Sequence, residues 1–249
     1  MITHPADACA RLGRAGSLEG LDRDTMDRSL ERESGPYLQL AVDTLDTTAA
    51  LQILEEVHPH CDIIEIGTPL IIEEGLSALE ALKSKYPDKL YLADTKIMDA
   101  GRMEAESAFR RGADIVTVLA LADDQTIRGA LEAASTHEGR IMIDLINTPD
   151  PLGRAAELER FGVHVFCLHT AYDRQKEGEL QTTNLRVMRE SVKGLLAIAG
   201  GIKLEHVRET VLTGADIVVV GGGIISQPSR GEAAAKMMDE LRKASHERN

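Results

Sequence analysis

The sequence lacks clusters of lysine and arginine, the residues with which proteins bind nucleic-acid backbones. Its 28 Lys and Arg are outnumbered by 41 Asp and Glu, which gives a formal charge of -13 and a pI of about 5.1. Because phosphate backbones are held mainly by basic side chains, we expect no nucleic-acid partner. Small anions remain possible ligands.

Long apolar runs are also missing. No segment approaches the roughly 18 consecutive apolar residues that a membrane helix needs. The first residues, MITHPADACARLGRAG, do not contain the apolar stretch of a secretory signal. We therefore expect a cytoplasmic protein with no membrane partner.

Cysteine is scarce, and the positions of Cys9, Cys61 and Cys167 do not have the spacing of metal ligands. Two of the three lie in apolar runs. Since a free cysteine in such a run behaves as a small apolar residue, we expect buried thiols rather than a metal site.

The length and apolar content are sufficient for one large core. The chain has 249 residues, 43% of them hydrophobic, and a single α/β barrel often uses this length; two small domains are the alternative. Residues 1–36 show no lasting apolar period, and we expect a mobile extension there. A docking helix within it is the alternative. Residues 37–249 are predicted to form the catalytic domain.

From Tyr37 onward, short β-rich runs recur with helical stretches between them. Asp46 or Thr47, Asp123 and Pro151 are predicted to begin helices. The spacing fits a strand, a helix and two loops per unit, and eight such units close into a (β/α)8 TIM barrel, an α/β fold. The predicted strands are residues 37–43, 61–67, 89–96, 113–120, 140–147, 163–170, 195–201 and 215–222.

Polar residues stand where the predicted strands end, and in such a barrel these ends carry the chemistry. Alternation along the first strand directs Asp43 into the barrel mouth and Gln39 toward the interior. Asp94 and Lys96, two apart, are predicted to project to the same side. The complete set is Asp43, Glu65, Asp94, Lys96, Asp144 and His169.

A lone acid at a strand end is often a helix cap or a loop acceptor, and this is the alternative for Asp43. The convergence of the whole set favours a site instead. Converging carboxylates repel each other unless a cation lies among them, so we expect Lys96 and a divalent metal there. Oxygen ligands with a single histidine favour Mg²⁺ over zinc.

Two glycine-rich stretches, IAGGIK (198–203) and VGGGII (220–225), follow the seventh and eighth predicted strands. Barrels commonly hold a phosphate in these two loops. Glycine lets the anion approach the backbone N–H groups that bind it. The pair of stretches therefore predicts a phosphate site.

Six segments in this order, LQLAVD, IIEIGTPL, DTKIMDAG, HTAYDRQ, AIAGGIK and VVGGGI, resemble the orotidine monophosphate decarboxylase suite. Within it they resemble the branch of 3-hexulose-6-phosphate synthases and 3-keto-L-gulonate-6-phosphate decarboxylases. The resemblance runs from Tyr37 to the C-terminal helix. The acid-x-Lys-x-x-acid motif that defines the suite is present as Asp94, Lys96 and Asp99.

The resemblance implies a Mg²⁺ ion held by Glu65 and Asp94 and an enediolate intermediate. It also implies a homodimer in which Asp99 reaches into the neighbouring subunit's site. His169 matches the acid/base histidine of the family, and Asp144 stands where the decarboxylases have Glu. The phosphate-binding residues that it implies are Gly200, Gly201, Gly222 and Gly223.

Two departures from the decarboxylase pattern distinguish the decarboxylases from the synthases. The decarboxylases carry an arginine three residues after the histidine and another in the eighth loop, whereas this chain has Tyr172 and Gly222. The loss of both cations argues against a substrate with an extra carboxylate and for the synthases, whose second substrate is formaldehyde. Ala171, where many synthases have Gly, departs from the synthase pattern.

The expected reaction is therefore the aldol condensation of D-ribulose 5-phosphate with formaldehyde to D-arabino-3-hexulose 6-phosphate, and its reverse. His169 is expected to be the base, because its ordinary pKa lies near neutral, and Lys96 to hydrogen-bond the enediolate oxygens. Asp43, Asp99 and Asp144 would orient sugar hydroxyls or relay protons. A 6-phospho-3-hexuloisomerase is a candidate partner. The alternatives are the decarboxylase and a non-catalytic barrel that binds a sugar phosphate.

Overall fold

The computed structural model describes residue 30 and residues 35–177 and 182–248. Most of the predicted extension, residues 1–29 and 31–34, lies outside this part of the chain. Cys9 lies outside it as well. Leu30 is described, and only 3% of its surface is exposed.

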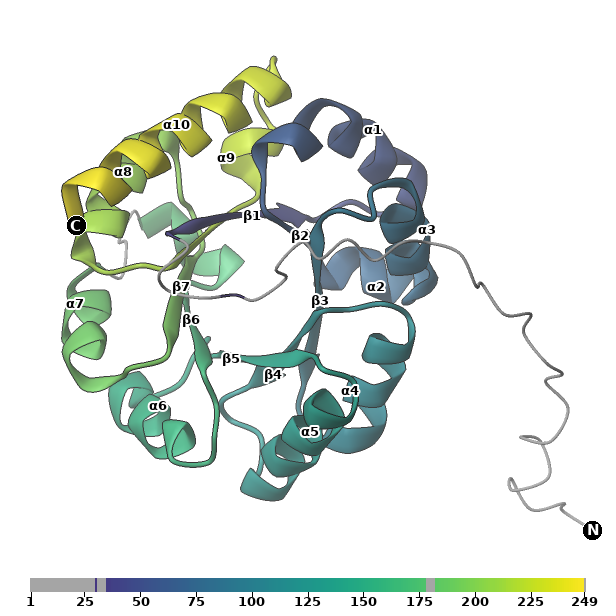
Figure 1. Ribbon diagram of the computed structural model, residues 1–249, viewed down its shortest axis with the longest axis vertical. Helices are drawn as coiled ribbons and strands as arrows, with labels where there is room; N and C mark the ends of the chain where they lie inside the picture. The colour runs from purple at the N-terminus through teal and green to yellow at the C-terminus, as the bar shows by residue number, and fades with distance from the viewer. Residues whose placement is uncertain (1–29, 31–34, 178–181, 249) are drawn as a thin grey trace, which may run out of the picture.

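Eight parallel strands form a closed barrel in which β1 pairs with both β2 and β8 (Figure 1). The predicted (β/α)8 barrel is confirmed, because every predicted strand is present. The strands are β1 (Tyr37–Val42), β2 (Ile63–Ile66), β3 (Leu90–Ile97), β4 (Ile115–Leu119), β5 (Arg140–Asp144), β6 (Val165–His169), β7 (Leu195–Ala199) and β8 (Ile217–Val220).

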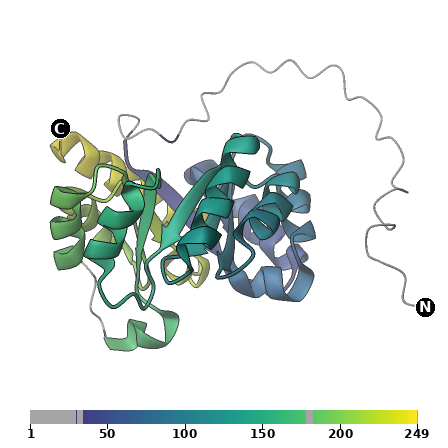
Figure 2. The same ribbon diagram turned by 90° about the horizontal axis from the view of Figure 1, so that it is seen from below.

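Helices surround the barrel, as Figure 2 shows from the side. Two predicted caps are confirmed: the Asp46 side chain accepts a hydrogen bond from Ala49 N at 2.7 Å, and Asp123 accepts one from Gln125 N at 2.8 Å. The helices are α1 (Thr47–Val57), α2 (Thr68–Glu74), α3 (Ser77–Lys85), α4 (Gly101–Arg110), α5 (Asp124–Thr136), α6 (Pro151–Glu159), α7 (Thr182–Ser191), α8 (Leu204–Thr213), α9 (Gly222–Ile225) and α10 (Arg230–Arg248), with short 3-10 turns η3 (His58–His60) and η4 (Tyr172–Glu177).

Alternation along the strands divides the core into two layers. Leu38, Leu40 and Val42 pack between the barrel and its helices. The barrel interior holds a separate cluster that contains Ala41 and inward side chains of the other strands. Leu30 belongs to this inner cluster.

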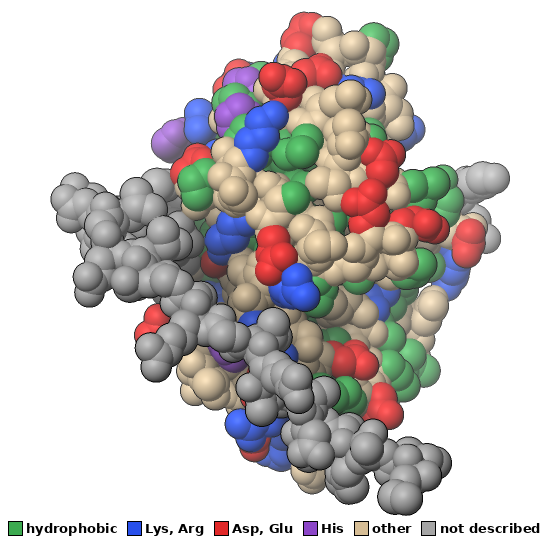
Figure 3. Space-filling view, turned by 90° about the vertical axis from the view of Figure 1, so that its right-hand side faces the viewer, with side chains coloured by type: hydrophobic (Ala, Val, Ile, Leu, Met, Phe, Trp, Pro, Cys, Tyr) green, Lys and Arg blue, Asp and Glu red, His purple; other side chains and the backbone are tan. Residues whose placement is uncertain are grey.

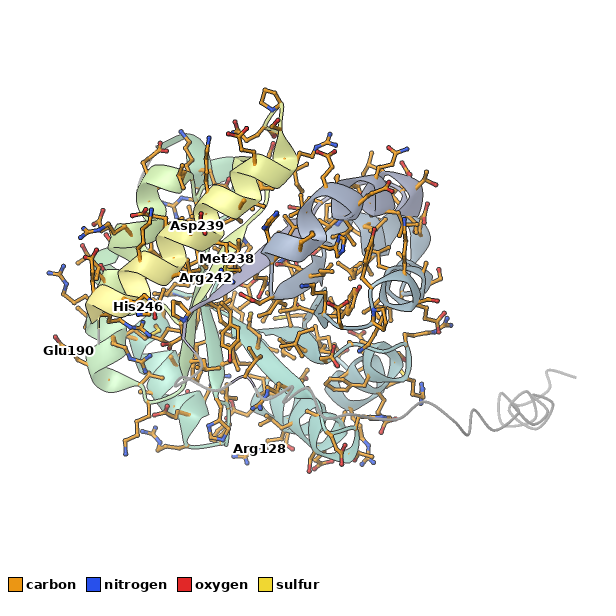
Figure 4. All side chains as sticks on the ribbon, turned by 45° about the horizontal axis from the view of Figure 1, so that its top comes forward. Arg128, Glu190, Met238, Asp239, Arg242 and His246 are labelled. Atoms are coloured by element: carbon orange, nitrogen blue, oxygen red, sulfur yellow. The ribbon has the colours of Figure 1, made fainter. Side chains whose placement is uncertain are left out.

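Helix α10 packs against α1, α8 and β1, and Figure 4 labels several of its side chains. Met238, Arg242 and His246 of α10 line a cavity of about 300 Å³ together with Tyr37 and Asp62. Because these last two residues lie at the amino ends of β1 and β2, this cavity is at the opposite end of the barrel from the predicted site.

Cys61 and Cys167 are buried free thiols, as predicted, and burial raises the pKa of Cys61 to about 12. In the part of the chain that the structure describes, every helix is too short or too polar to cross a membrane.

Candidate active site

A cavity of about 770 Å³ opens at the carboxyl ends of the strands. Its walls are formed by strand ends and by the loops that follow them. Of the predicted site residues, only Asp99 is absent from its lining. The predicted residues that line it are Asp43, Glu65, Asp94, Lys96, Asp144, His169, Gly200, Gly201, Gly222 and Gly223.

Strand β3 is irregular at the two residues predicted to lie side by side. Its register against β4 shifts between Ala93 and Ile97, and Lys96 has a φ of 48°, in the left-handed region. The regular extended strand expected here is therefore wrong, although the two side chains do meet. A residue held in such a conformation costs on the order of 1–3 kcal/mol and persists only when its surroundings fix it.

Thr117 of β4 fixes this irregular segment. Its hydroxyl accepts a hydrogen bond from Lys96 N at 2.9 Å and donates one to Asp94 Oδ1 at 2.9 Å. Its carbonyl accepts a hydrogen bond from the Thr95 hydroxyl at 3.0 Å. Thr117 was not among the predicted site residues, because it stands within an ordinary apolar strand and no local pattern distinguishes it.

The Lys96 ammonium lies between two carboxylates. Its Nζ is 2.7 Å from Asp94 Oδ2 and 3.2 Å from Asp144 Oδ2. Burial favours the neutral amine, but the charges of Asp94 and Asp144 and the hydrogen bond to Asp94 outweigh it and raise the pKa of Lys96. The side chain is therefore a fixed cation rather than a base or a nucleophile.

His169 and Asp144 form a hydrogen-bonded pair. His169 Nδ1 lies 2.9 Å from Asp144 Oδ2, and Ile146 N donates to the other oxygen of Asp144 at 2.9 Å. Burial raises the pKa of Asp144, but its hydrogen bond with His169 and the charges of His169 and Lys96 outweigh burial and lower it. Because an ionised carboxylate only accepts hydrogen bonds, Nδ1 carries the proton and leaves Nε2 as the basic nitrogen.

Glu65 is almost completely buried, with 8% of its surface exposed. Gln39 Nε2 donates a hydrogen bond to its Oε2 at 2.6 Å. Burial, followed by the negative charge of Asp94, raises the pKa of Glu65 well above its ordinary range. Gln39 was predicted to face the barrel interior, but its contact with Glu65 was not foreseen.

Asp43 projects over the backbone of Gly67. A Cβ atom on Gly67 would lie 2.1 Å from Asp43 Oδ1, so only glycine permits this approach. Desolvation and the charge of Asp94 raise the pKa of Asp43. Asp43 accepts no helix-capping hydrogen bond, since the cap of α1 is Asp46.

The donor set fits the Mg²⁺ ion that the resemblance implies. Mg²⁺ is usually held by one or two carboxylates and keeps several waters. Asp43, Glu65 and Asp94 place more negative charge here than Lys96 neutralises. Burial first, and then the charge of Asp94, raise the pKa values of Asp43 and Glu65. Across the described ranges, no three His, Cys, Asp or Glu side chains lie together as a complete metal-binding group. An ion held by one or two of these carboxylates would complete its shell with water and substrate oxygens.

The glycine loops after β7 and β8 lie at one side of the cavity. Gly200 and Gly201 have φ values of 98° and 72°, which favour glycine. A Cβ on Gly200 would lie 2.3 Å from Thr170 O, and one on Gly223 would lie 2.4 Å from Ile202 O. Close backbone approach thus requires glycine at both positions.

Asp99 does not reach the cavity of its own chain. It is exposed, and its Oδ1 accepts a hydrogen bond from Ala100 N at 2.7 Å. This placement leaves the expected role of Asp99 in a neighbouring subunit as a prediction. Tyr172, at the position of one decarboxylase arginine, lines the cavity and is 83% exposed.

The fold and the site together define a (β/α)8 barrel with a cavity at the carboxyl ends of its strands that is lined by carboxylates, a lysine and a histidine. A sequence profile described as "Orotidine 5'-phosphate decarboxylase / HUMPS family" matches residues 36–237. The chain belongs to this family.

Individual relatives lie in the branch that the sequence resembles. The 3-hexulose-6-phosphate synthase of Bacillus subtilis is 44% identical over 201 residues, which are 80% of this chain and 96% of the relative. The crystal structure of 3-hexulose-6-phosphate synthase from Salmonella typhimurium has a TM-score of 0.81 at 37% identity and covers 84% of this chain and 99% of its own. The crystal structure of KGPDC from Streptococcus mutans in complex with D-R5P has a TM-score of 0.79 at 25% identity. The match covers 84% of this chain and 98% of that chain.

Replacing Glu65 with glutamine should stabilise the metal-free protein, and more at pH 8 than at pH 5. Because the folded pKa of Glu65 lies above its unfolded value of about 4.3, ionisation costs stability as pH rises from the unfolded pKa through the folded one. The amide avoids this cost and can still accept the Gln39 hydrogen bond. Thermal melts in EDTA should show a gain of a few degrees at pH 8.

The matched control is Glu132→Gln, because the Glu132 side chain is 64% exposed. It should change the melting temperature little at either pH. If the melting temperatures of Glu65→Gln and of the unmodified protein change with pH in parallel, ionisation of Glu65 does not destabilise the folded protein.

Proposed function

We propose that the protein catalyses the aldol condensation of D-ribulose 5-phosphate with formaldehyde to D-arabino-3-hexulose 6-phosphate, and the reverse cleavage. The observation that carries this proposal is the continuous chain of contacts from His169 through Asp144 and Lys96 to Asp94. It supports a mechanism in which His169 is the base, Lys96 a fixed cation and Asp94 a metal-binding carboxylate around one cavity. The identity to 3-hexulose-6-phosphate synthases supports the same reaction.

His169 Nε2 removes a proton from C1 of the sugar in this mechanism. Asp144 holds the ring through Nδ1 and stabilises the imidazolium that forms. The electrons of the broken C–H bond pass into a 1,2-enediolate, whose C1 then bonds to the carbon of formaldehyde. The imidazolium returns its proton to the new alkoxide oxygen, which leaves the enzyme unchanged.

Lys96 and the acids stabilise and orient the intermediate. The Lys96 ammonium donates hydrogen bonds to the enediolate oxygens, while Asp43 and Asp144 orient hydroxyl groups of the sugar. Glu65 and Asp94 would hold Mg²⁺, which when bound supplies a Lewis acid for the charge on the sugar oxygens. The glycine loops after β7 and β8 would receive the phosphate.

The test is a coupled assay of the purified protein with D-ribulose 5-phosphate and formaldehyde. Hexulose 6-phosphate should form, activity should disappear in EDTA, and excess Mg²⁺ should restore it. A parallel incubation with 3-keto-L-gulonate 6-phosphate should release no CO₂. Release of CO₂ without any condensation would replace this proposal with the decarboxylase.

A homodimer is part of the same proposal. Asp99 is exposed, and so is its apolar sequence neighbour Met98. Figure 3, which faces the right-hand side of Figure 1, shows several apolar side chains along its right-hand edge. A partner subunit covering this surface would remove apolar area from water and could receive Asp99. Sedimentation analysis tests it, since a monomer would end this part of the proposal. Exposed apolar residues close to Asp99 in the sequence are Met98 and Met103, and Ile72 and Leu121 are exposed as well.

A further inference from the structure

The charges that line the active-site cavity are unbalanced. Among the side chains that the structure describes, four carboxylates line it but only two lysines, Lys96 and Lys203. Lys96 is already engaged by Asp94 and Asp144. A sugar phosphate that enters this acidic cavity brings about two further negative charges, so its binding requires a cation that the acids do not already neutralise.

Lys203 meets this requirement. It follows the glycine pair of the β7 loop directly before α8, lines the same cavity as Gly200 and Gly222, and is exposed. Its backbone N donates to His206 Nδ1 at 3.1 Å, which fixes the main chain at this point. Among the side chains that the structure describes, which stop at Gln175 and resume at Thr182, no carboxylate lies within ion-pair distance of its ammonium.

The eighth loop supplies no cation of its own. Gly221, Gly222 and Gly223 face the cavity there, followed by Gln227. Backbone N–H groups can bind a phosphate by themselves, but they cannot neutralise it. A lysine placed beside them acts as a point charge on the phosphate oxygens.

We infer that Lys203 is the cation that binds the substrate phosphate beside the glycine loops after β7 and β8. The inference rests on the proposed function for the identity of the sugar phosphate. Lys203 is placed at the end of the substrate away from the reacting carbon, so it contributes equally to binding substrate and transition state. Its removal therefore weakens binding without slowing the chemical step.

The kinetic test is Lys203→Met. The KM for D-ribulose 5-phosphate should rise about 10- to 100-fold, the range of one hydrogen bond to a charged group, while kcat stays unchanged. Lys203→Arg should restore most of the loss. Lys243→Met is the matched control, because it removes the same charge from a side chain that is 70% exposed on α10. An unchanged KM in Lys203→Met would overturn the inference.

A second measurement is independent of catalysis. Thermal shifts of the whole protein are recorded with D-ribulose 5-phosphate, D-ribulose and inorganic phosphate. Lys203→Met should need about 10- to 100-fold more of either phosphate compound for the same shift, and its response to D-ribulose should match that of the unmodified protein. Equal responses to phosphate in both proteins would overturn the inference.

The kinetic assay and the thermal-shift measurements together distinguish this inference from the proposed function. If the unmodified protein performs no condensation but its phosphate response depends on Lys203, the proposed reaction fails and the phosphate cation stands. If condensation is normal and Lys203→Met behaves like the unmodified protein in both assays, the proposed reaction stands and Lys203 has no such role.

Discussion

Replacing His169 with alanine is expected to slow exchange of the C1 proton of D-ribulose 5-phosphate by about a hundredfold or more. The reason is geometric: Nδ1 is bound to Asp144, which leaves Nε2 as the basic nitrogen at the cavity wall. The exchange rate, measured by NMR in D₂O without formaldehyde, isolates the proton-removal step. Condensation should fall by at least the same factor, because it requires the same enediolate.

His164→Ala is the matched control for this variant. His164 precedes the same strand at its amino end and is exposed there, far from the cavity. Its replacement should leave both rates within about twofold, as for a surface substitution away from any special feature. Proton exchange that survives in His169→Ala would assign the base to another group.

Replacing Lys96 with methionine is expected to reduce kcat by about a hundredfold or more, because it removes a preorganised cation from the charge that develops during reaction. It should also lower the melting temperature, since Asp94 and Asp144 lose a shared partner while they remain buried. The folded pKa of Lys96 is raised, so its contribution to stability is fully present below its unfolded pKa of about 10.4. Both losses should therefore appear at neutral pH.

The control variant Lys83→Met separates the loss of kcat from the loss of thermal stability. Lys83 pairs with Asp114 at 2.9 Å, and both side chains are 21% exposed, close to the 26% of Lys96. This pair lies outside the cavity lining. The control should therefore lose stability but keep kcat. Equal kcat values for Lys96→Met and the unmodified protein would remove Lys96 from the mechanism.

The barrel was predictable because its signals are local and repeated. Each strand combines apolar residues at a spacing that any short window contains, and side chains such as Asp46 and Asp123 mark helix starts within three residues of the groups they cap. The alternation that sent Leu38 outward and Gln39 inward likewise depends only on the extended chain. Repetition of eight units then determines closure.

The details of the site were less predictable, because they depend on contacts between distant parts of the chain. The bulge at Lys96 requires Thr117, which is 21 residues away along the sequence. The hydrogen bond between Gln39 and Glu65 joins two strands 26 residues apart. Asp99 differs from these residues, because its sequence motif is recognisable, whereas its expected contact requires a second subunit.

The position of Leu30 indicates where a second enzyme or a solid support can be attached to the protein. Its side chain is buried in the cluster of the barrel interior, and the described chain resumes at Gly35 and enters β1 from its amino end. The substrates must enter at the other end of the barrel, where the cavity opens. Fusing a second enzyme or a solid support ahead of Leu30 should therefore leave the entrance free, which makes that end the one to choose for building a formaldehyde-capturing material.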